Sequence, residues 1–443
     1  MSILNVNKIN PVGGGSTITI AGIASVTSSV TAPSFVGAVT GNVTGNVTGN
    51  VTGNVAGDAT GLSGNPSINT SGIVTATSFV PTVGQLSHRN IIINGAMNVA
   101  QRATTTTTQT YGYQCIDRFR TGTSGLDEGA TIAQADVSSG TTPYTSGFRK
   151  CLKVTNGNQT SGAGAGDYIQ IDYTVEAQDL AQSGWNYKSS SSNITFSFWI
   201  KSSVAQAFPY AFQSKDGTSQ VFNINTPTLT ADTWTKVTKT IPGNSNIQFD
   251  NDNGSGLKIM FFPYLGTNFT TNGLAEDTWS TFTTAKYGAG ATTTTWYTTN
   301  DATFEITGLQ LEVGSVATPF EHRSYQDEFL RCCRYYYKLE RRFTAAGRGA
   351  GSSAYLASVS TPVPLRAEPT LGTGTNSASE GFSIRVYKYD GISDSSATPT
   401  VGTGGWAAGN NHITFYQGSH SVVDDRVLNV YMGGGYIDFN SEL

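Results

Sequence analysis

One stretch of the chain, residues 304–337, changes its hydrophobic period midway. In its first part apolar and polar residues alternate, which predicts a strand. From Tyr325 the apolar positions recur at helical spacing through Phe329 to Tyr336, which predicts a helix over residues 325–339. A closing strand followed by one helix indicates a joint between two β regions, with these three aromatic residues at its centre.

Two local signals refine this joint. The apolar residues of the strand move from even to odd positions at Gly308, and such a shift of parity predicts a β-bulge. Ser324 is a suitable N-cap for the helix because Asp327 follows three residues later.

Residues 115–322 predict a single β-sandwich. Alternating or continuous apolar runs separated by turn residues mark its strands at residues 168–175, 194–200, 234–241, from 257 onward, and 296–313. About eight strands over roughly 200 residues suit a jelly roll. We therefore expect a mostly β protein.

The regions around this sandwich complete the expected domain order. Residues 86–114 are predicted to be a connector, and residues 323–342 a connecting helix. Residues 343–443 predict a small C-terminal β-sandwich that forms a tip, with strands near residues 355–359, 382–389, 412–416 and 426–432.

The first 85 residues read as an elongated low-complexity β stalk. The segments VTAPSFV and VTATSFV are near copies, and TGNV repeats run between them. In an extended chain a period of four places the repeated valines on one face, namely Val43, Val47, Val51 and Val55. Such a thin face is buried when three chains wind together, which predicts a homotrimer. A flexible Gly-rich linker is the alternative interpretation.

Composition excludes several classes of protein. Charged residues make up 13% of the chain and the net charge is −4, so a nucleic-acid-binding surface is not expected. The sequence contains no apolar run of about 18 residues and no N-terminal secretory pattern. These features fit a part assembled in a cell's cytoplasm and released by lysis, as a virion component is.

No catalytic motif stands out, so we expect no enzymatic activity, cofactor or metal ion. The four histidines are scattered, and the paired carboxylates at 127–128 and 276–277 lie in loop-like contexts. Residues 250–254 (DNDNG) resemble a calcium loop but lack the acidic residue at loop position 12, so a polar turn is expected. Adjacent Asp117 and Arg118 are expected to form an exposed local ion pair.

Aromatic residues in Gly-, Ser- and Thr-rich settings are the candidate ligand contacts. A flat exposed ring can cover the face of a sugar, and the polar end of Tyr or Trp can hydrogen-bond its hydroxyl groups. The candidates are Trp185, Tyr187, Trp279, Trp296 and Trp406. The alternative is that these tryptophans are core or trimer-interface residues, as expected for Trp234 at the start of a strand.

Several longer motifs add to this picture: NIIINGAMNVAQR at 90–102, DRF at 117–119, GLQLEVGSVATPFEHRSYQDEFLRCCRYYYK at 308–338, VPLRAEPT at 363–370, and the terminal GGYIDFNSEL. With these motifs the chain resembles tail-fibre and related receptor-binding proteins of tailed bacteriophages, especially those of marine cyanobacterial phages. The terminal segment departs from the commoner ending of that family, so the receptor's identity does not carry over.

The resemblance implies a homotrimeric fibre whose N-terminus faces other tail or baseplate proteins of the virion. It also implies a carbohydrate-binding-module-like sandwich in the middle and a C-terminal tip that contacts a glycan or protein of the host surface. The expected function is adsorption to the host through cell-surface carbohydrate. Two alternatives stay open: a neck, collar or baseplate fibre with a purely structural role, and a tailspike-type polysaccharide depolymerase.

Overall fold

The computed structural model describes residues 88–108, 110–271, 275–289, 294–340, 344–349, 355–374, 383–388, 391–393, 412–417, 427–434 and 436–443. The chain divides into two units at residues 76 and 77, and the described residues all belong to the second unit, Thr77–Leu443. The predicted boundaries at 114/115, 322/323 and 342/343 fall inside the second unit. The valines of the predicted stalk (Val43, Val47, Val51 and Val55) and Trp406 lie outside the described residues.

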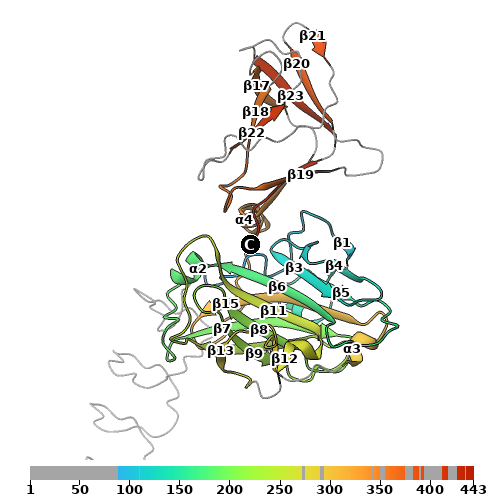
Figure 1. The fold of residues 1–443 in the computed structure, drawn as a ribbon, viewed down its shortest axis with the longest axis vertical. Coiled ribbons are helices and arrows are strands. Elements are labelled where there is room, and N and C mark those ends of the chain that lie inside the picture. Colours follow the sequence, from blue (N-terminus) through green and yellow to red (C-terminus); the bar gives the residue numbers. More distant parts are fainter. Residues whose placement is uncertain are drawn as a thin grey trace, which may run out of the picture. The chain divides into compact units, whose positions relative to one another are not determined.

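Two antiparallel sheets form the jelly-roll β-sandwich that the sequence predicts (Figure 1). The six-stranded sheet has the order β1 (Thr105–Thr108), β4 (Ala130–Asp136), β5 (Lys150–Thr155), β15 (Thr303–Val313), β7 (Asn193–Ser202), β10 (Thr235–Pro242). The seven-stranded sheet has the order β13 (Trp279–Thr281), β9 (Gln220–Asn225), β8 (Pro209–Ser214), β11 (Ser255–Leu265), β6 (Tyr168–Glu176), β3 (Phe119–Ser124), β2 (Gly112–Tyr113). Short helices α1 (Thr142–Thr145) and α2 (Ala177–Ala181) interrupt the connections.

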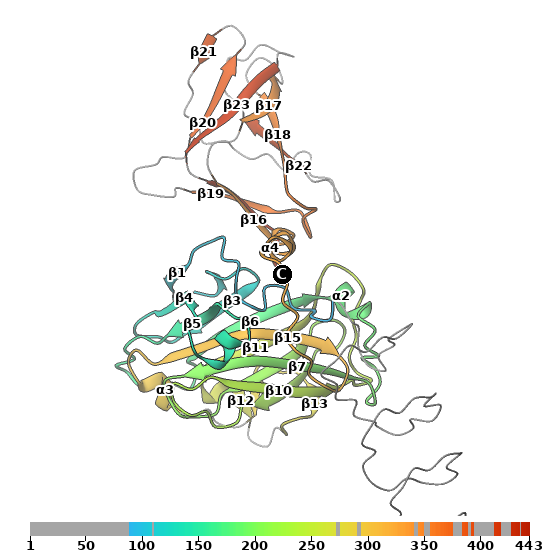
Figure 2. The same cartoon turned by 180° about the vertical axis from the view of Figure 1, so that it is seen from behind.

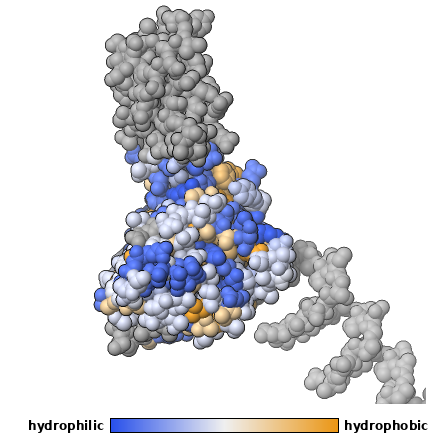
Figure 3. All heavy atoms as spheres, turned by 90° about the vertical axis from the view of Figure 1, so that its right-hand side faces the viewer, coloured by the Kyte–Doolittle hydropathy of each residue, from blue (hydrophilic) through white to orange (hydrophobic). Residues whose placement is uncertain are grey.

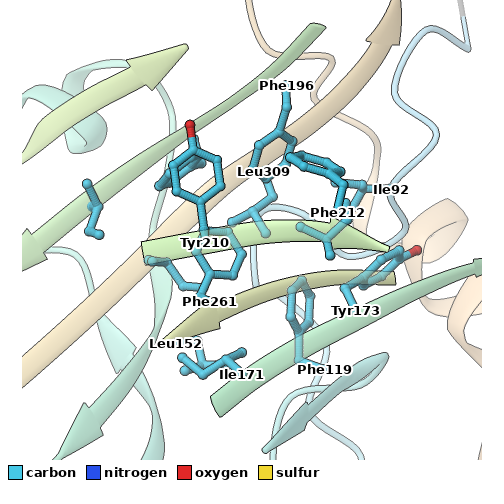
Figure 4. Close-up of a cluster of buried hydrophobic side chains, with 14 of the residues drawn as sticks. Ile92, Phe119, Leu152, Ile171, Tyr173, Phe196, Tyr210, Phe212, Phe261 and Leu309 are labelled. Carbon is cyan, nitrogen blue, oxygen red and sulfur yellow. The ribbon is translucent and has the colours of Figure 1, made fainter. Parts of the chain in front are cut away.

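The core lies between the two sheets, where alternate residues of each strand point inward. Large apolar and aromatic side chains from both sheets meet there, and Figure 4 labels several of them, among them Phe119, Ile171, Phe196, Phe261 and Leu309. Phe196 and Phe261 are 0% and 1% exposed, and their rings lie 6.0 Å apart. Alternation along the predicted strands therefore identified the buried face correctly.

The closing strand β15 contains the predicted bulge. Its register with β7 shifts between Thr307 and Gln310, and Gly308 has a φ of +65°. Because the bulge restores the inward direction, Ile306 and Leu309 both belong to the core between the sheets despite their opposite parity. The prediction that this strand begins at residue 296 is wrong, since residues 295–298 form the short helix α3 (Thr295–Thr298) and the strand starts at Thr303.

The predicted connector, residues 86–114, contributes to the sandwich. Its described part supplies Ile92 and Met97, both 0% exposed, to the main core. The Ile91 amide donates to the Leu311 carbonyl, and the Leu309 amide donates to the Gly95 carbonyl, so this segment runs along β15. Strands β1 and β2 also come from this region.

Helix α4 (Tyr325–Cys333) begins as predicted and ends earlier. The Ser324 side chain accepts a hydrogen bond from the Asp327 amide at 3.2 Å, which confirms the N-cap. The expected continuation of the helix to residue 339 is wrong, because residues 336–340 form strand β16 (Tyr336–Glu340). Pairing of β16 with a distant strand overrides the local helical spacing.

The three expected joint residues occupy different environments. Tyr325 is 62% exposed and stacks on Phe329, with ring centres 6.2 Å apart. Phe329 packs against a small cluster that includes Val99 and Tyr335. Tyr336 is 3% exposed and belongs to β16 rather than to the helix.

The remainder of the chain forms further sheets. A three-stranded antiparallel sheet has the order β16, β24 (Tyr436–Asn440), β19 (Thr370–Gly374). A six-stranded sheet has the order β21 (Gly391–Ser393), β20 (Ser383–Lys388), β23 (Val427–Gly434), β17 (Thr344–Gly349), β18 (Tyr355–Ser360), β22 (His412–Gln417). The four strands predicted after residue 343 correspond to β18, β20, β22 and β23.

The last strand returns the chain to the middle of the three-stranded sheet, and the C-terminus lies beside α4 in both views (Figures 1 and 2). The residues after β24 are anchored: the Ser441 amide donates to the Tyr335 carbonyl, and Arg366 donates to the Ser441 and Glu442 carbonyls. Residues 436–443 therefore close this sheet.

A buried ion pair between Arg118 and Glu442 also holds the C-terminal residues in place. Its Nη1 lies 2.5 Å from Glu442 Oε2, its Nη2 donates to the Thr174 carbonyl, and its guanidinium lies 3.4 Å from the centre of the Tyr335 ring. The expected exposed pair with Asp117 is wrong, because both residues are 0% exposed and Asp117 accepts hydrogen bonds from Gln101 instead.

Candidate functional site

The tryptophans expected to present exposed rings are buried in the sandwich. Trp185, Trp279 and Trp296 are 3%, 8% and 0% exposed. Each indole N–H donates to a backbone carbonyl, at 3.2, 2.8 and 2.9 Å respectively. The described rings are thus core residues, as the alternative interpretation held, and Trp234 is also 8% exposed. Tyr187 is half-buried against Phe249, with ring centres 4.7 Å apart.

A groove occurs instead on the outer face of the seven-stranded sheet. Along β6, Ile169, Ile171 and Tyr173 point into the core, so Tyr168, Gln170 and Asp172 point outward. Beside them, the segment that follows β11 folds back over the sheet. This segment includes the 3-10 helix η2 (Thr267–Phe269), β12 (Thr270–Thr271) and β14 (Gly288–Ala289).

The folded-back segment covers only one part of that outer face. Its aromatic residues Phe269, Phe282 and Tyr287 pack on a cluster that contains Met260 and Phe262 of β11. The uncovered part is a cavity of about 340 Å³, which we call the outer groove. Its lining residues are Tyr111, Tyr168, Gln170, Lys258, Leu265, Phe269, Thr284 and Tyr287.

Four polar side chains of the outer groove make no hydrogen bond to any residue that the structure describes. Gln170 is 6% exposed, and its amide makes no hydrogen bond to any other residue that the structure describes. The hydroxyl groups of Tyr168, Thr284 and Tyr287 likewise have no hydrogen-bond partner among the described residues. Burial, followed by the nearby Asp172 carboxylate, raises the pKa of the Tyr287 hydroxyl, so it stays protonated and can donate.

Tyr111 forms one wall of the outer groove and is 44% exposed. A Cβ placed on Gly122 of β3 would lie 2.0 Å from the Tyr111 ring, so the ring rests directly on the glycine backbone. The Tyr111 hydroxyl donates to Asp172 Oδ2 at 2.7 Å and accepts from Lys258 Nζ at 2.8 Å. The Arg120 guanidinium lies 4.3 Å from its ring centre. These contacts hold a partly exposed ring in one orientation.

Asp172 organises the floor of the outer groove. Its Oδ2 lies 2.8 Å from both Arg120 Nη2 and Lys258 Nζ, and its side chain is 0% exposed. Burial lowers the pKa of the Lys258 ammonium group, and the Asp172 carboxylate opposes that shift. Burial, followed by the same carboxylate, raises the pKa of the Tyr111 hydroxyl far above its usual value.

A second cavity, of about 260 Å³, lies where residues 88–93 meet α2 and α4. Arg89, Arg323 and Arg331 line it, and each has a carboxylate oxygen within 3.3–3.9 Å. Its cations are therefore already neutralised by the protein itself. The outer groove is the better candidate because its hydrogen-bonding groups without partners among the described residues lie beside a partly exposed aromatic ring.

Asp127 of the first carboxylate pair and Asp252 of the calcium-like loop both accept hydrogen bonds from nearby residues of the chain. Asp127 accepts hydrogen bonds from the Ser161 amide and hydroxyl, which lower its pKa. Asp252 accepts from the Gly254 amide within the 250–254 turn. Among the described residues no group of three or more His, Cys, Asp or Glu side chains is arranged to hold a metal ion.

The surface on the side that Figure 3 shows carries small hydrophobic patches between hydrophilic residues. No helix in the described part of the chain is long and apolar enough to span a bilayer.

The sequence contained part of the signal for the outer groove. The alternation of YIQIDYTV places Tyr168, Gln170 and Asp172 on the face opposite the core, so these residues were identifiable as outward-facing. Nothing local indicates that Tyr111 lies on Gly122, since no residue pattern connects that loop to β3.

Neither the protein-family models nor the curated proteins contain a sequence match to this chain. Among solved structures, the chain is similar to the enzymatically active domain of bacteriophage CBA120 tailspike protein 4, with 8% identity and a TM-score of 0.27 over 51% of this chain and 21% of that one. It thus spans about a fifth of that tailspike chain.

Two further solved structures are similar to about half of this chain. A putative sugar binding protein from Bacteroides thetaiotaomicron has 10% identity and a TM-score of 0.27, over 51% of this chain and 100% of that one. A family 11 carbohydrate-binding module of a Clostridium thermocellum cellulase has 14% identity and a TM-score of 0.22, over 49% of this chain and 98% of that one. At these values the similarities decide nothing about ligand or activity.

Proposed function

We propose that this chain is a receptor-binding component of a bacteriophage tail fibre and that its sandwich binds a cell-surface glycan in the outer groove. The observation that carries the binding proposal is the set of unpartnered polar groups beside partly exposed aromatic rings. Gln170, Tyr168, Thr284 and Tyr287 supply the polar groups, and Tyr111 supplies the most exposed ring.

This combination suits a sugar better than an apolar ligand. A pyranose has a flat apolar face that stacks on an aromatic ring, and its hydroxyl groups need several donors and acceptors. Gln170 offers both a carbonyl oxygen and an amide group, and each tyrosine hydroxyl can donate or accept. Because Tyr111 is held by Asp172, Lys258 and Gly122, little side-chain entropy is lost on binding.

The proposal includes binding without hydrolysis. Cleavage of a glycosidic bond in most glycosidases requires two carboxyl groups facing each other across the bond. The described lining of the outer groove contains no Asp or Glu, and the buried carboxylate of Asp172 beneath it is held by Arg120 and Lys258. Analysis of reducing ends after incubation with a bound glycan tests this part, since their release would indicate a depolymerase.

The assignment to a virion rests on the repeats before residue 85 and on the phage-like motifs of the sequence. We propose a homotrimer whose N-terminal region attaches to other tail or baseplate proteins. Sedimentation of the full chain at micromolar concentration should give a trimer, and a stable monomer would contradict it. Labelling of the C-terminal region on phage particles should place it on a tail appendage, whereas a label confined to the neck or collar would favour a structural fibre.

Glycan-array screening of the full chain, followed by calorimetry on the best ligand, tests the binding proposal. Tyr111→Ala should reduce affinity at least about tenfold, since a stacked aromatic and its hydrogen bonds are lost. Tyr325→Ala is the matched control because it removes a tyrosine that is 62% exposed on α4 and does not line the groove. Equal loss in both variants, or no loss in Tyr111→Ala, would contradict binding in the outer groove.

A further inference from the structure

The charges beneath the outer groove do not balance. Arg120 on β3 and Lys258 on β11 both approach a single carboxylate, Asp172 on β6, at 2.8 Å. The three strands are adjacent in the sheet, and all three side chains occupy its outer face. Two cations and one anion leave about one unit of positive charge at this position.

No other described residue of the groove compensates this excess. Among the lining residues Lys258 alone carries a charge, and the others are tyrosines, Phe269, Leu265, Gln170 and Thr284. Tyr111 stays neutral because burial and Asp172 raise its pKa. This contrasts with the cavity beside α4, where every arginine of the lining has its own carboxylate.

Lys258 also keeps hydrogen-bonding capacity for a ligand. An ammonium group has three N–H donors, and Lys258 Nζ uses two of them on Asp172 Oδ2 and on the Tyr111 hydroxyl. Lys258 lines the cavity although it is only 8% exposed. A charge in such a partly desolvated position interacts more strongly with an opposite charge than it would in water.

We propose that the outer groove is selective for acidic glycans, whose sugar units carry a carboxylate, sulfate or phosphate group that accepts a hydrogen bond from Lys258. This inference rests on the proposed function, because it names the ligand class of the same groove. The acidic group binds at the Lys258 side, and the ring of the same or the neighbouring sugar stacks on Tyr111. Gln170 and the free tyrosine hydroxyls bind the remaining hydroxyl groups of the sugar.

A pair of probes that differ in charge and in one methyl group per sugar tests this selectivity. Oligogalacturonates and their methyl esters have the same chain and the same hydroxyl groups, while only the former are anionic. With the full chain in calorimetry, the acid should bind at least about tenfold more tightly than the ester, and its affinity should fall as salt rises from 50 to about 300 mM. Sulfated and phosphorylated oligosaccharides are parallel arms that distinguish which acidic group is preferred.

Variants assign any preference to Lys258. Lys258→Met should bring the acid-to-ester ratio close to one, whereas Lys258→Arg should retain it because the charge remains. Arg120 still pairs with Asp172 in both variants, and circular dichroism confirms folding. Lys239→Met is the matched control. Lys239 lies on β10, the edge strand of the other sheet, and pairs with Asp277, so its loss should leave the ratio unchanged.

The outcomes separate this inference from the proposed function. If neutral glycans or methyl esters bind as well as acids, and Tyr111→Ala abolishes that binding, glycan binding stands and acid selectivity is overturned. If acidic glycans bind more tightly than their esters but Lys258→Met leaves the acid-to-ester ratio unchanged, the assignment to this lysine is overturned. If no neutral, sulfated, phosphorylated or uronic glycan binds in a Tyr111-dependent way, the proposed function fails, and this inference fails with it.

Discussion

Replacing Glu442 with glutamine tests the closure of the three-stranded sheet against the sandwich. The substitution keeps the shape of the side chain and removes the carboxylate that neutralises Arg118, whose side chain is 0% exposed. Glu442 is itself 3% exposed, and Arg102, 11% exposed, lies 3.4 Å from its other oxygen. Removing one partner of a buried ion pair costs about 3–5 kcal/mol, because the remaining charge stays buried and uncompensated.

We expect a loss near the lower end of that range, about 3 kcal/mol, since Arg118 keeps its hydrogen bond to the Thr174 carbonyl and its stacking on Tyr335. Urea unfolding followed by tryptophan fluorescence measures it as a shift of the midpoint at unchanged slope. Glu340→Gln is the control, because it breaks an ion pair with Lys338 in which the Glu340 side chain is 49% exposed. Such an exposed pair contributes at most about 1 kcal/mol. If the two variants unfold at the same urea concentration, the buried pair does not hold the sheet in place.

Other changes probe other parts of the fold. Burial raises the pKa of Asp117 from 3.8 to about 6, so between these values the folded state binds a proton that the unfolded state has lost. Stability should therefore fall as the pH rises from about 4 to about 6, and Asp117→Asn should flatten that fall in urea titrations. Gly308→Ala should cost at least about 2 kcal/mol in the same assay, since its Cβ would lie 2.7 Å from Phe148 at a φ of +65°, and an unchanged midpoint would contradict the bulge. Phe329→Ala should speed proteolysis after α4, whereas Tyr325→Ala, at a residue 62% exposed, should not; equal cleavage rates would count against the joint.

The alternation of apolar and polar residues predicted most of the sandwich, because it shows which face of each strand is buried. The inward residues of β6 and β7 follow directly from period two, and the change of parity at Gly308 located the bulge. The N-cap at Ser324 was also predictable, since a cap depends on residues three positions apart.

Features that depend on distant partners were not predictable. Trp185 and Trp296 stand in polar, Thr- and Ser-rich neighbourhoods, yet a loop carries Trp185 and the short helix α3 carries Trp296 into the core, because the composition around a residue does not report its burial. Arg118 reads as half of a local pair with its neighbour, but its actual partner, Glu442, is 324 residues away. The strand at Tyr336 likewise depends on pairing with β24, which a helical spacing cannot anticipate.

The register of the three-stranded sheet makes the protein modular. Glu340 ends β16 and Gly374 ends β19, and both pair with Tyr436, the first residue of β24. The chain between Gly374 and Tyr436, which includes β20 to β23, thus departs from and returns to directly paired positions, as a hairpin loop does. Because the entropy of closing a loop grows only with the logarithm of its length, a change of length in this segment costs the three-stranded sheet little. β22 and β23 pair with β18 and β17, which precede β19, so a replacement segment must supply two strands that complete the six-stranded sheet, while the residues that seal the base stay constant.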